Sequence, residues 1–368
     1  MSKESFRYQE VYNELFQDIC SGHWKAGESL PSEKELSARF DTSTITIKRA
    51  LEMLKTEGLV RRVPGRGTFV NLTKKERNQE DTQSPEGGNM IGLILEHVSS
   101  AFGLDMMYDI ILRLEKSGFK VCIRFTFGSI EKETEEIRDL LNMHVRGLIV
   151  MPCHDSYYNK TILRLILDDF PVVLVDKRMH GIPVSTVCTD GAGAIQQLIR
   201  HLKDRGARDA FLMTIDPVGT SSLGDRTEGF YRGLEETGIR NAGELILPKR
   251  ESNYLSYEPE KQYVDAISHF LETTPEIPSS IVCTEYAIGR ALYVAACKKG
   301  LRVGEDLRIC CIDENWLSVQ GFTLTHMRQD EHTIAEKAVE ILLQIIQGTK
   351  HEPVNIRVPA IFHQGSST

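Results

Sequence analysis

The sequence contains no apolar run that approaches the roughly 20 residues a membrane-spanning helix needs. Its opening stretch, MSKESFRYQE, also lacks the apolar segment of a secretory signal peptide. We therefore expect a cytoplasmic protein with no membrane partner.

The eight cysteines are not spaced like zinc ligands or like a disulfide framework. None belongs to a CxxC pair, and Cys122, Cys153, Cys188 and Cys283 lie in apolar stretches. Buried free thiols are expected, in agreement with a reducing compartment.

Recognisable catalytic motifs are missing as well. The chain has no GxSxG, no HExxH, no P-loop and no GxGxxG after a predicted strand. Its 11 histidines form no cluster typical of metal ligands. We expect no enzymatic activity, no catalytic residues, no metal site and no cofactor.

Acidic residues outnumber basic ones, 52 to 44, but positive charge is concentrated in one place. The net charge is −8, yet residues 48–77 hold nine lysines and arginines and only three acids, a local net charge of +6. Residues 61–70 read RRVPGRGTFV, three arginines on a segment built to turn. A basic patch on an acidic chain indicates one face that meets an anion.

A polar segment divides the chain. Residues 73–89, TKKERNQEDTQSPEGGN, have the composition of a flexible linker. The 368 residues are too many for one ordinary domain. We predict a head over residues 1–72, a linker over 73–89 and a body over 90–368.

The head shows the pattern of three helices followed by a basic hairpin. Apolar residues recur at helical spacing over residues 8–19, and Ser32 with Glu35 forms a capping box that opens a short second helix. DTST starts a third helix, and LVRRV and GTFV are strands joined by PGRG. This order is typical of a winged helix-turn-helix. The alternative is a small helical domain with a solvated charged loop.

The body alternates short apolar strands with amphipathic helices, which indicates an α/β fold with parallel sheets covered on both faces. The predicted strands are MIGLILE, KVCIRFTF, GLIVMP, PVVLVD, VSTVCTD, AFLMTI, SSIVCT and LRICCID. They are too many for one comfortable sheet, so we predict two doubly wound lobes. Ligands of such folds bind at the carboxyl ends of the strands, here in a cleft between the lobes.

The head resembles the DNA-binding domain of the GntR family. The matching residues are Leu30-Pro31-Ser32-Glu33 with Leu36, then Ser43, Thr46, Lys48, Ala50, Leu51, Leu54, Gly58 and Leu59, and the wing end Gly65-Arg66-Gly67-Thr68-Phe69-Val70. The resemblance implies that the third helix enters the major groove of DNA and the wing enters the minor groove.

Residue chemistry agrees with that implication. The start of a recognition helix presents its side chains to base edges, and here it offers hydroxyls and a lysine. Glycines let a backbone approach a groove closely, and an arginine between them suits a narrow minor groove. The predicted DNA-binding residues are Lys34, Ser43, Thr44, Thr46, Lys48, Arg62, Gly65, Arg66 and Gly67. Helix capping by Ser43 and solvated charges at Lys48 and Arg62 are the alternatives.

The sequence departs from the family at two of these positions. Arginine is common in the family where Thr44 and Lys48 stand. Arginine reads guanine with two hydrogen bonds and lysine does so less rigidly, so the operator cannot be inferred from relatives.

The body resembles the effector domains of the LacI/GalR family and periplasmic sugar-binding proteins. The segments on which this resemblance rests are IGLILE, RGLIVMP, FPVVLVDKR, HLKDRGARDAFLM, DRTEGFYRGLEE, LRICCIDEN and LTHMRQD. A GntR-type head on a LacI-type body is similar to the arabinose repressors of Gram-positive bacteria. The resemblance implies a small sugar as effector, with a pentose such as arabinose favoured.

The same resemblance implies the ligand-binding positions. They are Phe102, Phe127, Asp176, Lys177, Arg226, Glu285, Asp313 and Gln329. Planar charged side chains pair well with sugar hydroxyls, and aromatic faces stack on sugar rings. The alternatives are a salt bridge for Arg226, helix capping for Asp176 and Asp313, and core packing for the two phenylalanines.

These observations predict a transcription regulator, a repressor, that binds operator double-stranded DNA as a homodimer and responds to a sugar. One alternative is a sugar-modifying enzyme tethered to DNA. Another is a ligand-independent DNA-binding protein.

Overall fold

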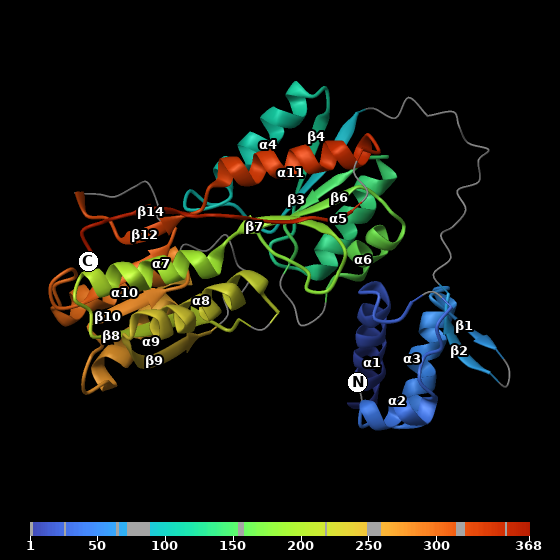
Figure 1. Ribbon diagram of the computed structural model, residues 1–368, viewed down its shortest axis with the longest axis horizontal. Helices are drawn as coiled ribbons and strands as arrows, with labels where there is room; N and C mark the ends of the chain where they lie inside the picture. The colour runs from blue at the N-terminus through green and yellow to red at the C-terminus, as the bar shows by residue number, and fades with distance from the viewer. Residues whose placement is uncertain are drawn as a thin grey trace. The chain divides into compact units, whose positions relative to one another are not determined.

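The computed structural model describes residues 3–25, 27–63, 66–71, 89–153, 158–217, 219–248, 259–313, 321–349 and 352–368 (Figure 1). It divides into two compact units. The smaller comprises Met1–Gly87, Ser156–Phe170 and Met179–Val184, and its N-terminal elements are called the head below. The larger, called the body, comprises Gly88–Asp155, Pro171–Arg178 and Ser185–Thr368. Of the predicted linker, only Asn89 lies within the described residues.

Three helices and a hairpin form the head, in the predicted order. They are α1 (Lys3–Cys20), α2 (Glu33–Arg39), α3 (Thr44–Thr56), β1 (Val60–Val63) and β2 (Gly67–Val70). Ser32 and Glu35 form the predicted capping box at the start of α2. The buried faces of the helices, which include Tyr12, Leu36 and Leu54, make a small core. The winged helix-turn-helix prediction is confirmed.

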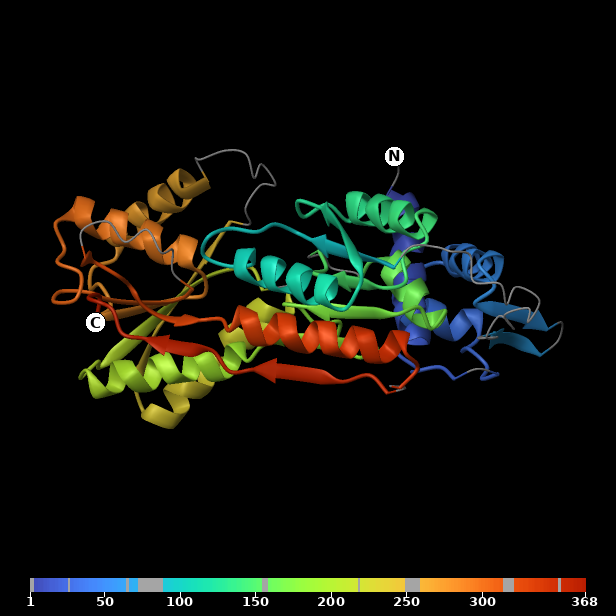
Figure 2. The same ribbon diagram turned by 90° about the horizontal axis from the view of Figure 1, so that it is seen from above.

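The first lobe of the body is a parallel sheet in the order β13-β7-β6-β5-β3-β4. Its strands are β3 (Met90–Leu95), β4 (Lys120–Phe125), β5 (Leu148–Val150), β6 (Val172–Val175), β7 (Ser185–Thr189) and β13 (Asn355–Val358). Helices α4 (Leu104–Lys116) and α11 (Glu331–Ile346) lie side by side on one face (Figures 1 and 2). Helix α5 (Ile130–Asn142) packs on β3 and β4. Helix α6 (Lys160–Leu167), which follows β5 along the chain, belongs to the smaller unit.

The second lobe is a sheet in the order β14-β12-β11-β10-β8-β9, parallel except for the edge strand β14. Its strands are β8 (Asp209–Ile215), β9 (Arg240–Leu247), β10 (Ser280–Cys283), β11 (Arg308–Ile312), β12 (Thr325–Arg328) and β14 (Ile361–His363). Helices α7 (Gly191–Asp204) and α8 (Ser221–Thr237) cover one face, and α9 (Pro259–Thr273) and α10 (Tyr286–Lys299) cover the other.

The two-lobed α/β body therefore agrees with the sequence prediction, and all eight predicted strands are present. Four strands were not predicted: β9, β12, β13 and β14. The cysteines are free thiols, and five of them are buried. Among the residues that the structure describes, no helix has the length and apolarity needed to cross a bilayer.

Candidate functional sites

Helix α3 begins immediately after a tight turn from α2. Asp41 adopts a left-handed conformation with φ 47°, and Ser43 caps α3 by accepting a hydrogen bond from the Thr46 amide at 3.2 Å. The hydroxyls of Ser43 and Thr46 lie 2.9 Å apart. The predicted capping role of Ser43 is therefore present, and Thr44, beside it, is exposed.

The predicted lysine and arginine positions of the head are exposed. Lys34 lies on α2, Lys48 on α3, and Arg62 and Arg66 in the hairpin. Glu33 forms ion pairs with Arg62 and, at 3.8 Å, with Lys48. These surface pairs contribute little to stability, since water screens them, so the cations can exchange Glu33 for another anion.

The hairpin that forms the wing pairs Arg62 with Thr68 and Val63 with Gly67. The Arg66 amide donates to the Val63 carbonyl at 3.0 Å, and Gly67 has φ 110°, which only glycine adopts readily. Gly65 lies outside the described residues. The described part of the wing thus carries an exposed arginine beside a glycine with positive φ.

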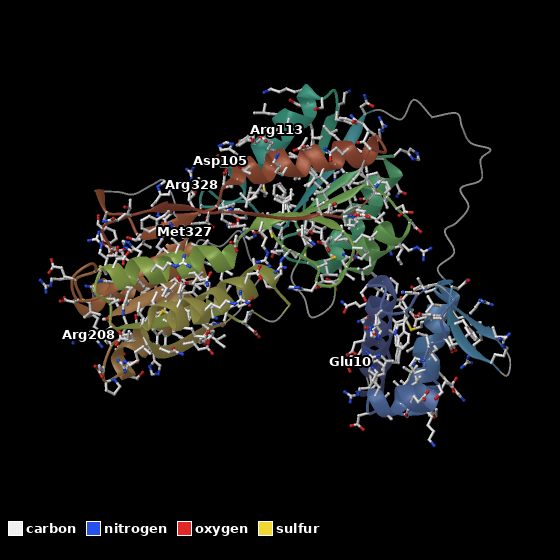
Figure 3. All side chains as sticks on the ribbon, viewed as in Figure 1. Glu10, Asp105, Arg113, Arg208, Met327 and Arg328 are labelled. Carbon is white, nitrogen blue, oxygen red and sulfur yellow. The ribbon has the colours of Figure 1, made fainter. Side chains whose placement is uncertain are left out.

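In the body, polar residues follow directly on buried strands of both lobes. Asp176 follows β6 with φ 68°, and Asp313 follows β11 with φ 64°. Non-glycine residues with positive φ are uncommon and concentrate at functional sites. Gln329 follows β12, the strand in which Met327 is buried in the core of the second lobe (Figure 3).

Lys177 is bound by groups of the first lobe. Its amine forms an ion pair with Glu96, lies 3.9 Å from the Asp176 carboxylate and donates to the Pro152 carbonyl at 3.1 Å. Burial opposes the positive charge, yet the Glu96 carboxylate keeps the pKa of Lys177 above its ordinary value. Glu96 closes the predicted strand IGLILE but was not predicted as a site residue.

Asp313 and Gln329 form a buried pair. The Gln329 side-chain amide donates to Asp313 at 2.8 Å, its backbone amide donates at 3.2 Å, and its oxygen accepts from the Thr189 hydroxyl at 2.5 Å. Burial raises the pKa of Asp313 to about 6, and the positive charge of Arg226 opposes that rise. Arg226, 6% exposed, also donates to the Thr284 carbonyl at 2.9 Å.

The remaining predicted ligand residues are less enclosed. Phe102 is half-buried against the first lobe's core, whereas Phe127 is 39% exposed and stacks on Phe125 at 5.9 Å. Glu285 is half-buried at the N-cap of α10 without a side-chain capping bond. The structure thus brings Arg226, Asp313 and Gln329 close to one another, with Asp176 near Asp313, whereas Lys177 pairs with Glu96 in the first lobe.

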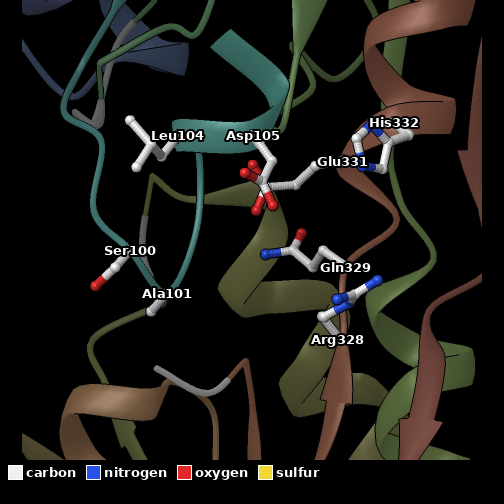
Figure 4. Close-up of a pocket in the computed structure, with 8 residues that line it drawn as sticks. All are labelled: Ser100, Ala101, Leu104, Asp105, Arg328, Gln329, Glu331 and His332. Atoms are coloured by element: carbon white, nitrogen blue, oxygen red, sulfur yellow. The ribbon is translucent and has the colours of Figure 1, made fainter. Parts of the chain in front are cut away.

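A pocket opens beside Gln329 at the start of α4 (Figure 4). Its lining residues are Ser100, Ala101, Leu104, Asp105, Arg328, Gln329, Glu331 and His332. The Glu331 carboxylate accepts from the amides of Gly103 at 2.9 Å and Met106 at 2.8 Å and lies beside Asp105. Burial raises the pKa of Glu331 to about 7, and nearby Asp313 and Asp105 add to the rise.

Sequence reasoning missed Glu331, whose only local signal is its place two residues after Gln329. It also missed the ion pair at 2.6 Å between Arg178 and Asp225, which joins the end of β6 to α8. Within the described ranges, no group of three or more His, Cys, Asp or Glu side chains is placed to hold a metal ion.

Comparison with known families matches part of each unit. Residues 7–70 match the family of bacterial regulatory proteins called gntR, and residues 199–368 match the periplasmic binding protein-like domain. The chain joins a gntR-type helix-turn-helix domain to a periplasmic-binding-protein-like domain.

Curated relatives are transcription regulators. The arabinose metabolism transcriptional repressor of Geobacillus stearothermophilus is 26% identical over 353 residues, which cover 93% of this chain and 91% of that protein. The HTH-type transcriptional regulator KdgR of Bacillus subtilis is 24% identical over 275 residues, 74% of this chain and 78% of that protein.

Solved structures show the same fold. A structure of the lac repressor dimer bound to operator and the anti-inducer ONPF has a TM-score of 0.63 at 19% identity, covering 76% of this chain and 94% of that one. The transcription regulator CcpA of Lactococcus lactis has a TM-score of 0.64 at 21% identity, covering 76% and 99%.

Proposed function

We propose that this protein is a transcriptional repressor of sugar metabolism whose affinity for operator DNA changes when a small sugar binds in the body. The observation that carries the proposal is the buried group of Arg226, Asp313 and Gln329, which gathers polar side chains at the strand ends of the second lobe. Such a group suits a polar ligand that offers several hydroxyls.

The head supplies the DNA-binding half of the proposal. The start of α3 presents Thr44, Thr46 and Lys48 to base edges, and the wing presents Arg62 and Arg66 to the backbone or the minor groove. Lys34, Ser43, Gly65 and Gly67 complete the proposed set. Exposed cations supply the attraction that phosphates require.

A pentose is the favoured effector. Arg226, Asp313 and Gln329 would bind its hydroxyls, with Asp176, Lys177 and Glu285 beside them and Phe102 and Phe127 against the ring. The relative from Geobacillus stearothermophilus is a repressor of arabinose metabolism, which supports this choice.

Dimerisation and ligand response would use the body. Tyr108 and Leu112 on α4 are 57% and 52% exposed, one helical turn apart, and form an apolar strip that suits a second copy of the chain. A sugar held between the lobes would favour one lobe arrangement over another and so change the geometry of the dimer.

The direct test is a thermal-shift screen of the full chain against pentoses, hexoses, uronates and disaccharides. A true effector at 100 times its dissociation constant adds about 2.7 kcal/mol to the stability of the body. A sugar that stabilises the protein should also alter its binding to the regulatory DNA beside its own gene in a gel-shift titration. Turnover of the sugar would favour the tethered enzyme, and no response to any ligand would favour the ligand-independent DNA binder.

Replacing Arg226 should separate the two activities. Arg226→Ala leaves the polar groups of the ligand without a bidentate partner, so we expect affinity for the effector to fall ten- to a hundredfold, about 1–3 kcal/mol, with operator binding unchanged. The matched control is Arg200→Ala, which removes an exposed arginine paired with Glu236 at 2.7 Å. A normal effector response in Arg226→Ala would remove this residue from the site.

The proposed domain boundary has its own test. We propose that residues 90–368 fold, dimerise and bind the effector without the head, because every strand of both body sheets lies in this range. Analytical ultracentrifugation and the same thermal-shift assay measure this. An insoluble or monomeric fragment, beside a dimeric full chain, would place the boundary elsewhere.

A further inference from the structure

One large apolar side chain of the head lies on the exposed side of its helix, where it does not pack in the core. Ile45, the second residue of α3, is 77% exposed, the most exposed large apolar side chain among the described residues. The buried face of the helix is formed by Ile47, Ala50, Leu51 and Leu54. Ile45 therefore gains almost nothing from burial, and its branched side chain is a weaker helix former than alanine or lysine.

Two cations follow Ile45 along the same side of α3, and in the free protein each contacts a residue of another helix. Lys48, three residues on, lies 3.8 Å from Glu33 of α2. The guanidinium of Arg49, four residues on, lies 3.9 Å from the ring centre of Tyr8 on α1. The first turn of α3 is thus left with Thr44 and Ile45 as its exposed side chains.

An apolar group at the start of a recognition helix has one natural partner on DNA. The major groove displays hydrogen-bonding groups on every base pair, but its apolar feature is the C5-methyl group of thymine. We propose that Ile45 packs against a thymine methyl in each operator half-site and so specifies a T·A pair there. This inference rests on the proposed function, because it assumes that α3 enters the major groove.

The experiment tests the contact from both sides. It removes the C5-methyl group of thymine, and it separately changes the side chain of Ile45. Operator sites are first selected from random DNA with the full-length protein, and each thymine is then replaced in turn by deoxyuridine, which lacks only the methyl. We expect one thymine per half-site at which this change weakens binding about three- to fourfold, the effect of ~0.8 kcal/mol for one buried methyl-sized group.

Two variants of Ile45 provide a matched pair. Ile45→Val keeps a branched apolar side chain, whereas Ile45→Ser carries a hydroxyl and no methyl group. The valine variant should remain sensitive to deoxyuridine at that thymine. The serine variant should bind the thymine operator about fourfold more weakly and show no further loss with deoxyuridine.

The outcomes separate this inference from the function on which it rests. The wild type could bind a specific sequence and yet be insensitive to deoxyuridine at every thymine. That result overturns the role of Ile45, whatever the variants do, and leaves the repressor proposal standing. Equal sensitivity of wild type and Ile45→Ser at the same thymine also overturns it. Selection that yields no preferred sequence contradicts the DNA-binding function itself.

Discussion

The polar residues of the head and those of the body are placed in opposite ways. In the head, Thr44, Lys48 and Arg66 are exposed, and the ion pairs they or their neighbours make lie on the surface. In the body, Lys177, Arg226, Asp313 and Gln329 are each less than 10% exposed and hold one another or the backbone.

This difference follows the size of the proposed ligands. A DNA duplex must be met by groups that already face water, and their partners in the free protein must be weak enough to give way. A small ligand is bound by groups that are enclosed before it arrives, and each enclosed charge must have a partner even when the site is empty. Substitutions of these enclosed body residues should therefore affect folding as well as binding, and those of the exposed head residues should affect binding alone.

The largest effect is expected from breaking the buried ion pair between Glu96 and Lys177 in the first lobe. Glu96→Gln leaves the buried ammonium of Lys177 without its main counter-charge, which should lower the free energy of unfolding of the body by about 3–5 kcal/mol. Denaturant titration followed by circular dichroism measures the loss. The double variant Glu96→Leu with Lys177→Met removes both charges and should recover most of that stability; equal losses in both variants would contradict the assignment.

A smaller effect concerns pH. Because the pKa of Glu331 in the folded protein, about 7, lies above its ordinary value of 4.5, its protonated form favours folding, and this contribution is lost as pH rises from about 4.5 through 7. Glu331→Gln retains an oxygen for the amides of Gly103 and Met106 and does not titrate. Between pH 5 and pH 8 the wild type should lose roughly 1–3 kcal/mol relative to this variant, seen as a falling difference in melting temperature. Parallel pH profiles would show that Glu331 does not titrate in this window.

The smallest effect is expected in the head, at the exposed side chain of Arg66. Arg66→Ala should leave the melting temperature unchanged, since the side chain is exposed, but weaken operator binding. If Arg66 neutralises one phosphate, the slope of log affinity against log salt should become less steep by about 0.9. Lys120→Ala, an exposed change at the start of β4, is the control. An unchanged slope with unchanged affinity would remove the wing from the interface.

Local features of the sequence predicted local structure well. The capping box of Ser32 and Glu35, the cap at Ser43 and the hairpin around Arg66 each depend on residues within a few positions of one another. The alternation of strands and helices likewise predicted both lobes, because each βαβ unit repeats the same short pattern.

Features that depend on distant partners were missed. Strands β13 and β14 are four and three residues long, and they form only because β7 and β12 offer free edges. The role of Glu331 depends on the start of α4, 228 residues away in the sequence. The sequence likewise predicted Lys177 as a site residue but could not show that Glu96, 81 residues earlier, binds it.

Strands β13 and β14, close to the end of the sequence, complete the two sheets of the body. Their position also sets the order in which the protein can fold during synthesis. The head elements are complete once residue 70 has been made, whereas the first sheet waits for β13 at residues 355–358 and the second for β14 at residues 361–363. At about 5–20 residues per second, the ribosome needs roughly 15–60 s to cover that interval. The buried hydroxyl of Ser367, which donates to the Ile309 carbonyl at 2.6 Å, comes later still. A nascent chain would therefore carry a finished helix-turn-helix head well before its body is complete, and ribosomes that stall near the end would release chains with both sheets left open at one edge.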